Sequence, residues 1–158
     1  SRVFTHELVR HRAGSAFSQE SMRFVRLDEL AMWVPEWAQQ DEELMTLIKG
    51  HLTLNEMLQK KLAEHFDLDN PEKGFNERKE KTSFMRRFAP EGVATSIVWT
   101  ANVRTLRNVI EQRTAKGAEE EIRMVFEKVG RIMVEEAPLL FPDYIVEDGA
   151  WTPRYKKV

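Results

Sequence analysis

The sequence predicts a mainly helical α+β fold, built as a single domain with a small antiparallel sheet. Three observations support this class. Long stretches carry apolar residues at helical spacing, one short stretch is rich in β-branched residues, and no repeat or low-complexity linker divides the 158 residues. A chain of this length can bury a core of its own.

The composition narrows the functional classes. A hydrophobic content of 42% and a charged content of 32% indicate a globular protein. The formal net charge of −2 gives no overall attraction to nucleic acid or to an anionic membrane, so an anion site has to be local. Cysteine is absent, which excludes disulfides, Cys-ligated zinc and a thiol nucleophile in this sequence and fits a cytoplasmic protein. No metal site and no membrane span are predicted.

The first half of the chain is predicted to be largely helical. The spacing of apolar residues in "RVFTHELVRHR" predicts a helix that ends near Arg12, and "AGSAFSQES" has the glycine and serine content of a loop. Residues 37–66 form the clearest helix, because leucine and isoleucine recur every four residues. The turn-rich stretch "DLDNPEKGFN" follows it.

The second half adds the strand candidate and three helices. "ERKEKTSFMRRF" predicts a helix that stops at Pro90. "GVATSIVWTA" is the best strand candidate, although its length also allows a helix. "NVRTLRNVIEQR" and "AEEEIRMVFEKVGRIMVEEA" predict amphipathic helices, the second with Ile132 among its buried residues, and the tail beyond Tyr144 is expected to be irregular.

Positive charge gathers at the start of the chain. Residues 1–26 hold five arginines and two glutamates, a net charge of +3 before histidines are counted. In Arg10-His11-Arg12, the arginines suit phosphate because a guanidinium donates two parallel hydrogen bonds. The three side chains could surround an extended polyanion such as a pyrophosphate. The alternative is a basic helix end that pairs with acids on a neighbouring element.

The predicted helix from Asn102 to Arg113 carries a second group of polar side chains. Arg104, Asn108 and Gln112 recur every four residues on one face, where they could read the edge of a ring or a ribityl chain; a solvated polar face is the favoured alternative. Arg113 falls on the apolar side, so its guanidinium needs an anionic or acceptor partner. The alternative is a cation that stabilises the helix end or pairs with a structural glutamate.

Three blocks in order resemble one family. "RHRAGSAFSQESMRF" resembles the signature of flavin-dependent thymidylate synthases, in which Arg-His-Arg precedes a serine and an arginine. "NVRTLRNVIEQR" is similar to the family's Asn-x-Arg-x-x-x-Asn-x-x-x-x-Arg segment, and "MRRFAP" to its Arg-x-x-x-Pro segment. The three blocks occur in order over residues 5–113, and together they are a much more specific signal than any one of them.

The resemblance implies an enzyme that methylates dUMP at C5 to give dTMP. Methylenetetrahydrofolate would donate the carbon, FAD would carry the hydride, and NADPH would reduce the flavin. The family's site is shared between subunits of a homotetramer. A flavin route fits a chain without cysteine, because no thiol has to add to the uracil. The alternatives are methylation of another uridine nucleotide and a flavin- or nucleotide-binding module without turnover; a nucleic-acid-binding protein is disfavoured by the near-neutral charge.

The resemblance also implies site residues, position by position. Arg113 would act in catalysis by contacting the uracil and promoting its ionised form. The residues expected to bind FAD are Arg10, His11, Arg12, Asn102, Arg104 and Asn108. The residues expected to bind dUMP are Glu7, Leu8, Val9, Arg10, Gln19, Glu20, Ser21, Met22, Arg23, Arg86 and Arg113.

The sequence departs from the family pattern at several points. Eight residues separate Arg12 from the matching serine where seven are usual, so either Glu20 or Ser21 could take the serine's role. Phe24 replaces the usual tyrosine, and Gly117 stands where some relatives have a flavin-contacting histidine. Only nine residues precede the Arg-His-Arg triplet, so the family's N-terminal region is expected to be missing from this chain.

Overall fold

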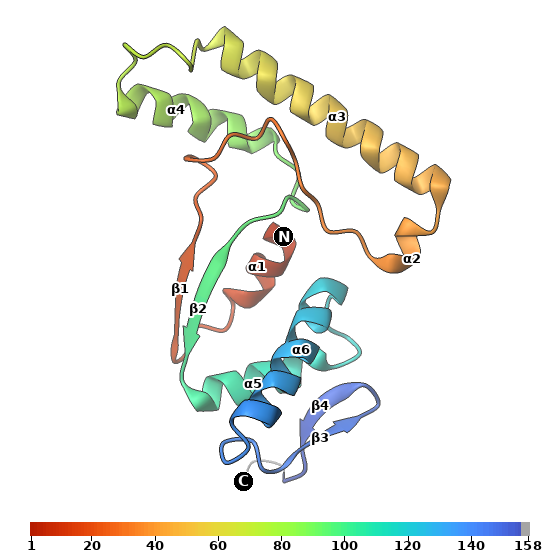
Figure 1. Ribbon diagram of the computed structural model, residues 1–158. Coiled ribbons are helices and arrows are strands. Elements are labelled where there is room, and N and C mark those ends of the chain that lie inside the picture. Colours follow the sequence, from red (N-terminus) through yellow and green to blue (C-terminus); the bar gives the residue numbers. More distant parts are fainter. Residues whose placement is uncertain (156–158) are drawn as a thin grey trace. The chain divides into compact units, whose positions relative to one another are not determined.

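The structure is a computed structural model that describes residues 1–155, about half of which lie in helices (Figure 1). Two small antiparallel sheets complete the secondary structure of this part of the chain, so the mainly helical α+β class is confirmed. The chain divides into two compact units. Unit 1 consists of Ser1–Arg2 and Gln19–Ser96, and unit 2 consists of Val3–Ser18 and the residues from Ile97 onward.

Two helices of unit 1 replace the single helix predicted for residues 37–66. They are α2 (Glu36–Gln39) and α3 (Glu42–His65). The break falls at Asp41, whose backbone is extended and whose side chain accepts a hydrogen bond from the amide of Leu44 at 2.9 Å. Asp41 therefore caps α3, because a carboxylate at this position satisfies an amide that has no partner within the helix.

The helix predicted before Pro90 is confirmed as α4 (Phe75–Met85), followed by the short 3-10 helix η1 (Arg86–Phe88). Two side chains of α3 hold this end. The amide of Asn55 donates to the carbonyl of Phe88 at 2.7 Å, and that of Gln59 donates to the carbonyl of Met85 at 3.2 Å. Gln59 is only 1% exposed, so this contact lies inside unit 1.

The core of unit 1 is small. Its buried cluster consists of Met22, Leu27, Leu30 and Val93, and Ala38, Leu68 and Met85 are buried outside that cluster. Several apolar side chains of α3 remain exposed instead, namely Leu47, Leu54, Met57 and Leu58. The regular spacing that predicted this helix therefore includes more apolar side chains than unit 1 buries.

The first helix, α1 (Arg2–Leu8), is shorter than predicted. It ends at Leu8, and the Arg-His-Arg triplet lies in a turn in which the amide of His11 donates to the carbonyl of Leu8 at 3.1 Å. Gly14, at φ +68°, then leads the chain into β1 (Ser15–Gln19). The loop predicted for "AGSAFSQES" is thus wrong, because this segment finds a strand partner far along the chain.

That partner is β2 (Ile97–Ala101), which lies within the predicted strand candidate. Both strands alternate between half-buried and exposed side chains, as expected for a sheet with one covered face. On the covered face, Phe17 and Trp99 pack against the core, and the indole of Trp99 donates to the hydroxyl of Ser15 at 3.0 Å.

The predicted amphipathic helices are confirmed as α5 (Val103–Thr114) and α6 (Glu120–Glu136). They supply most of the core of unit 2, while Ile132, predicted to be buried, is 54% exposed because it lies on the outer face of α6. The buried residues of this core are Leu8, Val109, Ile110, Ile122, Phe126, Phe141 and Tyr144.

The tail beyond Tyr144 is not irregular. It forms an antiparallel hairpin of β3 (Tyr144–Glu147) and β4 (Ala150–Pro153) (Figure 1). Asp148 and Gly149 form the two-residue turn with φ values of +52° and +80°, the left-handed conformation that such tight hairpin turns require. The hairpin packs on α5 and α6, where Trp151 lies against Gly130.

Candidate functional site

A cavity of about 410 Å³ in unit 2 brings together two of the distant sequence blocks. Arg10 and His11 line it from the turn after α1, and Gln112 and Arg113 line it from the end of α5. Gly117 completes the wall with two alanines, and a side chain at this position would meet open space. Arg10 and His11 of the predicted triplet therefore share one cavity with the predicted catalytic arginine, whereas Arg12 does not line it.

Arg113 is held from three sides. Its Nη1 donates to Glu7 Oε2 at 2.5 Å, its Nη2 donates to the Glu7 carbonyl at 3.1 Å, and its Nε donates to His11 Nε2 at 2.7 Å. Arg10 also reaches Glu7, with 3.2 Å between its Nη1 and Oε1. The side chain of Arg113 is 14% exposed, so the inward orientation expected from the sequence is observed. The alternative of pairing with a glutamate is observed as well, with Glu7 as the partner.

His11 is uncharged at neutral pH in this arrangement. Partial burial lowers its pKa from 6.5, and the positive charges of Arg113 and Arg10 lower the pKa further, while Glu7 opposes them. An uncharged ring agrees with the hydrogen bond, because Nε2 must carry a lone pair to accept the N–H of Arg113. His11 therefore orients a cation in this cavity and does not add a second positive charge.

The start of α5 is tied to the segment after the triplet. Asn102 caps α5 by accepting from the amide of Thr105 at 2.9 Å, and its own backbone amide donates to the carbonyl of Gly14 at 2.9 Å. The hydroxyl of Thr105 donates to the carbonyl of Ala13 at 2.6 Å. A side chain at Gly14 would lie 2.1 Å from the Asn102 amide nitrogen, so this close approach requires glycine.

These hydrogen bonds bring together the two backbone segments that carry Arg12 and Arg104, both predicted to bind the flavin. Arg12 precedes Ala13 and Arg104 precedes Thr105, the two residues joined by the 2.6 Å hydrogen bond. Both arginines are exposed, and neither has a side-chain partner within residues 1–155. Asn108, one turn further along α5, is half-buried and accepts from Gln112 at 3.4 Å.

Leu8 and Val9 belong to unit 2, and the other remaining predicted site residues belong to unit 1. Ser21 Oγ accepts from the backbone amide of Arg23 at 3.4 Å and from its Nε at 3.2 Å, so serine and arginine form one local group. Thr82 of α4 donates to the carbonyl of Arg23 at 2.8 Å. Arg86 opens η1, is exposed, and has no side-chain partner among the described residues.

Some predicted nucleotide contacts have side chains that are used in packing. Leu8 is 2% exposed and Met22 is 6% exposed, each in the core of its own unit. A ligand could reach only the backbone of these two residues. Gln19 is half-buried, and the carboxylate of exposed Glu20 accepts from the Ser96 hydroxyl at 3.5 Å.

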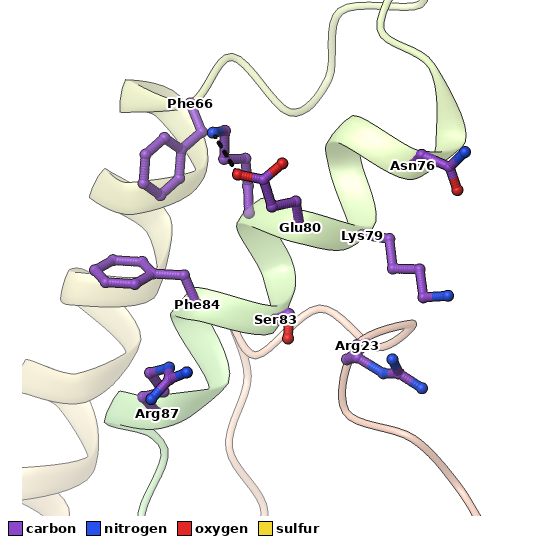
Figure 2. A pocket seen from close by; sticks show the side chains of 9 residues that line it. Arg23, Phe66, Asn76, Lys79, Glu80, Ser83, Phe84 and Arg87 are labelled. Atoms are coloured by element: carbon purple, nitrogen blue, oxygen red, sulfur yellow. Dashed lines mark hydrogen bonds and ion pairs between the residues drawn. The ribbon is translucent and has the colours of Figure 1, made fainter.

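A second cavity, of about 630 Å³, lies entirely within unit 1 and was not predicted from the sequence (Figure 2). Most of its wall comes from α4, including Lys79, Ser83 and Phe84. Arg23 and Arg87 contribute from the neighbouring segments. The only local signal was the basic character of "KEKTSFMRR", which is equally typical of a solvated helix face.

Two classes of feature do not occur within residues 1–155. This part of the chain has no cluster of three or more potential metal ligands. It also has no helix with the length and apolar content needed to cross a membrane.

Comparison with known proteins gives one consistent family. The family model described as thymidylate synthase complementing protein (Thy1) matches residues 1–139 and so runs through both units. A flavin-dependent thymidylate synthase of Corynebacterium diphtheriae is 33% identical over 155 residues, covering 95% of this chain and 61% of that protein. The corresponding protein of Mycobacteroides abscessus is 34% identical over 152 residues, covering 91% and 58%.

Solved structures show the same fold. A crystal structure of the flavin-dependent thymidylate synthase ThyX from Helicobacter pylori, complexed with FAD and dUMP, matches 90% of this chain and 68% of that chain with a TM-score of 0.62 and 22% identity. The chain spans about three fifths of the length of the curated relatives described above. With a family model that covers most of its residues, the chain belongs to the thymidylate synthase complementing protein family.

Proposed function

We propose that this protein carries out FAD-dependent methylation of dUMP to dTMP, with methylenetetrahydrofolate as the carbon donor and NADPH as the reductant. Membership of the family and the names of the relatives support this activity. The structural observation that carries the proposal is the Glu7–His11–Arg113 cluster, in which a cation is fixed in a cavity beside the family's signature triplet.

Arg113 has the hydrogen-bonding capacity to act on a uracil. A guanidinium has five N–H donors, and the described contacts of Arg113 use three of them. The two that remain, on Nη1 and Nη2, can donate to the oxygens and ionised N3 of the ring. A fixed cation at this position stabilises negative charge that develops on the pyrimidine when C5 acts as the nucleophile.

The residues proposed to bind FAD fit an anionic, acceptor-rich cofactor. The side chains of Arg12 and Arg104 have no acceptor within the described part of the chain, and a hydrogen bond from the Thr105 hydroxyl to the Ala13 carbonyl joins their neighbours. Arginine forks suit a pyrophosphate, while Asn102 and Asn108 offer amide donors along α5. When bound, the flavin supplies the hydride that completes the methyl group.

The residues proposed to bind the dUMP phosphate are Ser21, Arg23 and Arg86 of unit 1. The hydroxyl of Ser21 and the guanidinium of Arg23 already form one group, and Arg86 is free of described partners. We further propose a cytoplasmic homotetramer in which subunits share the complete site. Light scattering on the purified protein tests the assembly.

The flavin test requires only absorbance. The purified protein should bind FAD and be yellow. Arg104→Ala should lose the flavin, because the substitution removes a cation proposed to bind it. The fold should be kept, since Arg104 has no side-chain partner within the described residues. Lys128→Ala, at an exposed position on α6, is the matched control and should keep the flavin. Equal flavin content in both variants would contradict the assignment of Arg104.

Turnover is measured by tritium release from C5-labelled dUMP in the presence of methylenetetrahydrofolate and NADPH. Arg113→Ala should impair dUMP use more than flavin retention. Release from labelled UMP in place of dUMP would assign the protein to another uridine nucleotide. Flavin binding without release from either nucleotide would favour a binding module and overturn the proposed reaction.

A further inference from the structure

The unit 1 cavity is strongly positive. Four cationic side chains line it, and Glu80 is the single carboxylate among its lining residues. Glu80 is already engaged, since the Nζ atom of Lys81 lies 3.3 Å from its Oε1. The cations that line the cavity are Arg23, Lys79, Lys81 and Arg87, which leaves a net charge of +3 after Glu80 is subtracted.

Three of these cations have no acid to neutralise them among the described residues. Arg87 has no side-chain partner in this part of the chain. Lys79 contacts only aromatic rings, with its Nζ 5.9 Å from the Phe75 ring centre. Arg23 donates to the uncharged hydroxyl of Ser21. Like charges that share a cavity repel one another, so this arrangement favours an external polyanion.

The rest of the cavity wall suits a nucleotide. Figure 2 shows the hydroxyl of Ser83 between the side chains of Arg23 and Arg87, where it can donate to an anionic oxygen. Phe84 lines the same cavity and is 44% exposed. Its ring packs edge to face against that of Phe66, with 6.0 Å between the two ring centres. An exposed aromatic side chain next to cations offers a surface for a base beside its phosphates.

We propose that Lys79 and Arg87 form a binding site for the phosphates of a dinucleotide, which under the proposed function is the reductant NADPH. Arg23, on the same cavity wall, stays with the dUMP phosphate, and the two further cations without an acidic partner, in a cavity of about 630 Å³, leave room and charge for the phosphates of a second ligand. FAD, the other dinucleotide of the proposed reaction, is assigned to unit 2. The identification with NADPH rests on the proposed function, whereas the dinucleotide site itself does not.

The test is isothermal titration calorimetry with the purified protein and NADP⁺, which carries the same phosphates without delivering a hydride. Lys79→Gln and Arg87→Gln should each weaken NADP⁺ binding about tenfold, because each removes a charge-assisted hydrogen bond. Inorganic pyrophosphate should bind competitively with NADP⁺. Lys61→Gln, at an exposed position of α3 outside the cavity, is the matched control and should bind like the parent protein.

Glu80→Gln gives a result that damage to the fold cannot produce. It removes the only carboxylate of the cavity wall and releases Lys81, so NADP⁺ should bind more tightly, by about three- to tenfold. Unchanged or weaker binding in this variant, or unchanged binding in both Lys79→Gln and Arg87→Gln, would overturn the proposal.

A parallel titration with dUMP separates the two phosphate sources. If these variants weaken dUMP binding and leave NADP⁺ binding intact, the cavity serves the mononucleotide and the dinucleotide assignment is wrong. If NADP⁺ binding depends on Lys79 and Arg87 but no tritium is released from dUMP, the proposed reaction fails while the dinucleotide site stands.

Discussion

Two positions in unit 2 and two in unit 1 differ in how far internal contacts occupy an arginine or the space beside a glycine. In unit 2, Arg113 makes three hydrogen bonds to Glu7 and His11, and Gly130 lies against the indole of Trp151. In unit 1, Arg86 has no described side-chain partner, and Gly50 has no atom within 4 Å of where a side chain would begin. The same residue types therefore have different roles at these positions.

This difference separates structural from purely ligand-directed roles. A side chain with several internal partners contributes to stability whether or not a ligand is present. A cation without a partner contributes little to stability and is available to an anion from outside. Four sets of measurements test this difference.

The largest difference is expected between Arg113→Ala and Arg86→Ala. The first substitution should lower the free energy of unfolding by about 2 kcal/mol, because it removes three hydrogen bonds and one of the two cations paired with Glu7, whose side chain is 28% exposed. The second should change the free energy of unfolding by no more than about 0.5 kcal/mol. Urea unfolding of both variants measures the difference, and equal losses would mean that Arg86 stabilises the fold to the same extent that Arg113 does.

Two glycines within helices should respond to alanine with opposite signs. At Gly130 of α6 a new Cβ would lie 2.4 Å from Trp151, so Gly130→Ala should destabilise the fold by about 1–3 kcal/mol. At Gly50 of α3 the space is open, so Gly50→Ala should stabilise the helix by about 1 kcal/mol through its higher helix propensity. A loss of stability at Gly50 would show a contact that this structure does not contain.

A smaller effect is expected in the turns. Gly149 and Gly74 both face open space, but Gly149 has a φ of +80° whereas Gly74 has a φ of −65°. Gly149→Ala should cost about 1 kcal/mol of unfolding free energy, because a Cβ is disfavoured in the left-handed region. Gly74 is the N-cap of α4, where alanine is less favourable than glycine, so Gly74→Ala should cost about 0.5 kcal/mol, less than Gly149→Ala. Thermal melts of the two variants compare them, and equal melting temperatures would contradict the role given to the Asp148–Gly149 turn.

The smallest effect concerns pH. The pKa of His11 is lowered in the folded state, so below its unfolded value of 6.5 the unfolded chain binds more protons than the folded one. The stability that neutral His11 provides is therefore complete above about pH 6.5 and declines as the pH falls toward the folded pKa. His11→Gln should flatten this part of the stability profile between about pH 7 and about pH 5. An unchanged profile would contradict the stabilising contact between neutral His11 and Arg113.

The sequence predicted the helices better than the strands. α4, α5 and α6 follow from apolar spacing and from Pro90, which are local signals. β1 was missed because its short "SAFSQ" segment pairs with residues some eighty positions away. The β3–β4 hairpin could have been found, since Asp148-Gly149 is a common signal for a two-residue turn. The cap at Asp41 was a further local signal that separates α2 from α3.

The candidate site was predicted in part. The resemblance grouped Arg10, His11 and Arg113 in one expected site, and the structure places them around one cavity. Glu7 was named as a nucleotide neighbour, but its pairing with Arg113 could not be read from the sequence because the two lie 106 positions apart. The cationic cavity of unit 1 depends on the packing of α4 beside Arg23, which leaves no signature in composition.

The three-sided hold on Arg113 has a consequence for affinity. A free arginine side chain carries about 2 kcal/mol of rotamer entropy, which a ligand must suppress when it fixes the guanidinium. Glu7 and His11 have already suppressed much of this motion while the chain folds. A pyrimidine that docks against Arg113 thus meets a donor whose direction is set beforehand, and more of its contact energy remains for distinguishing one nucleobase from another.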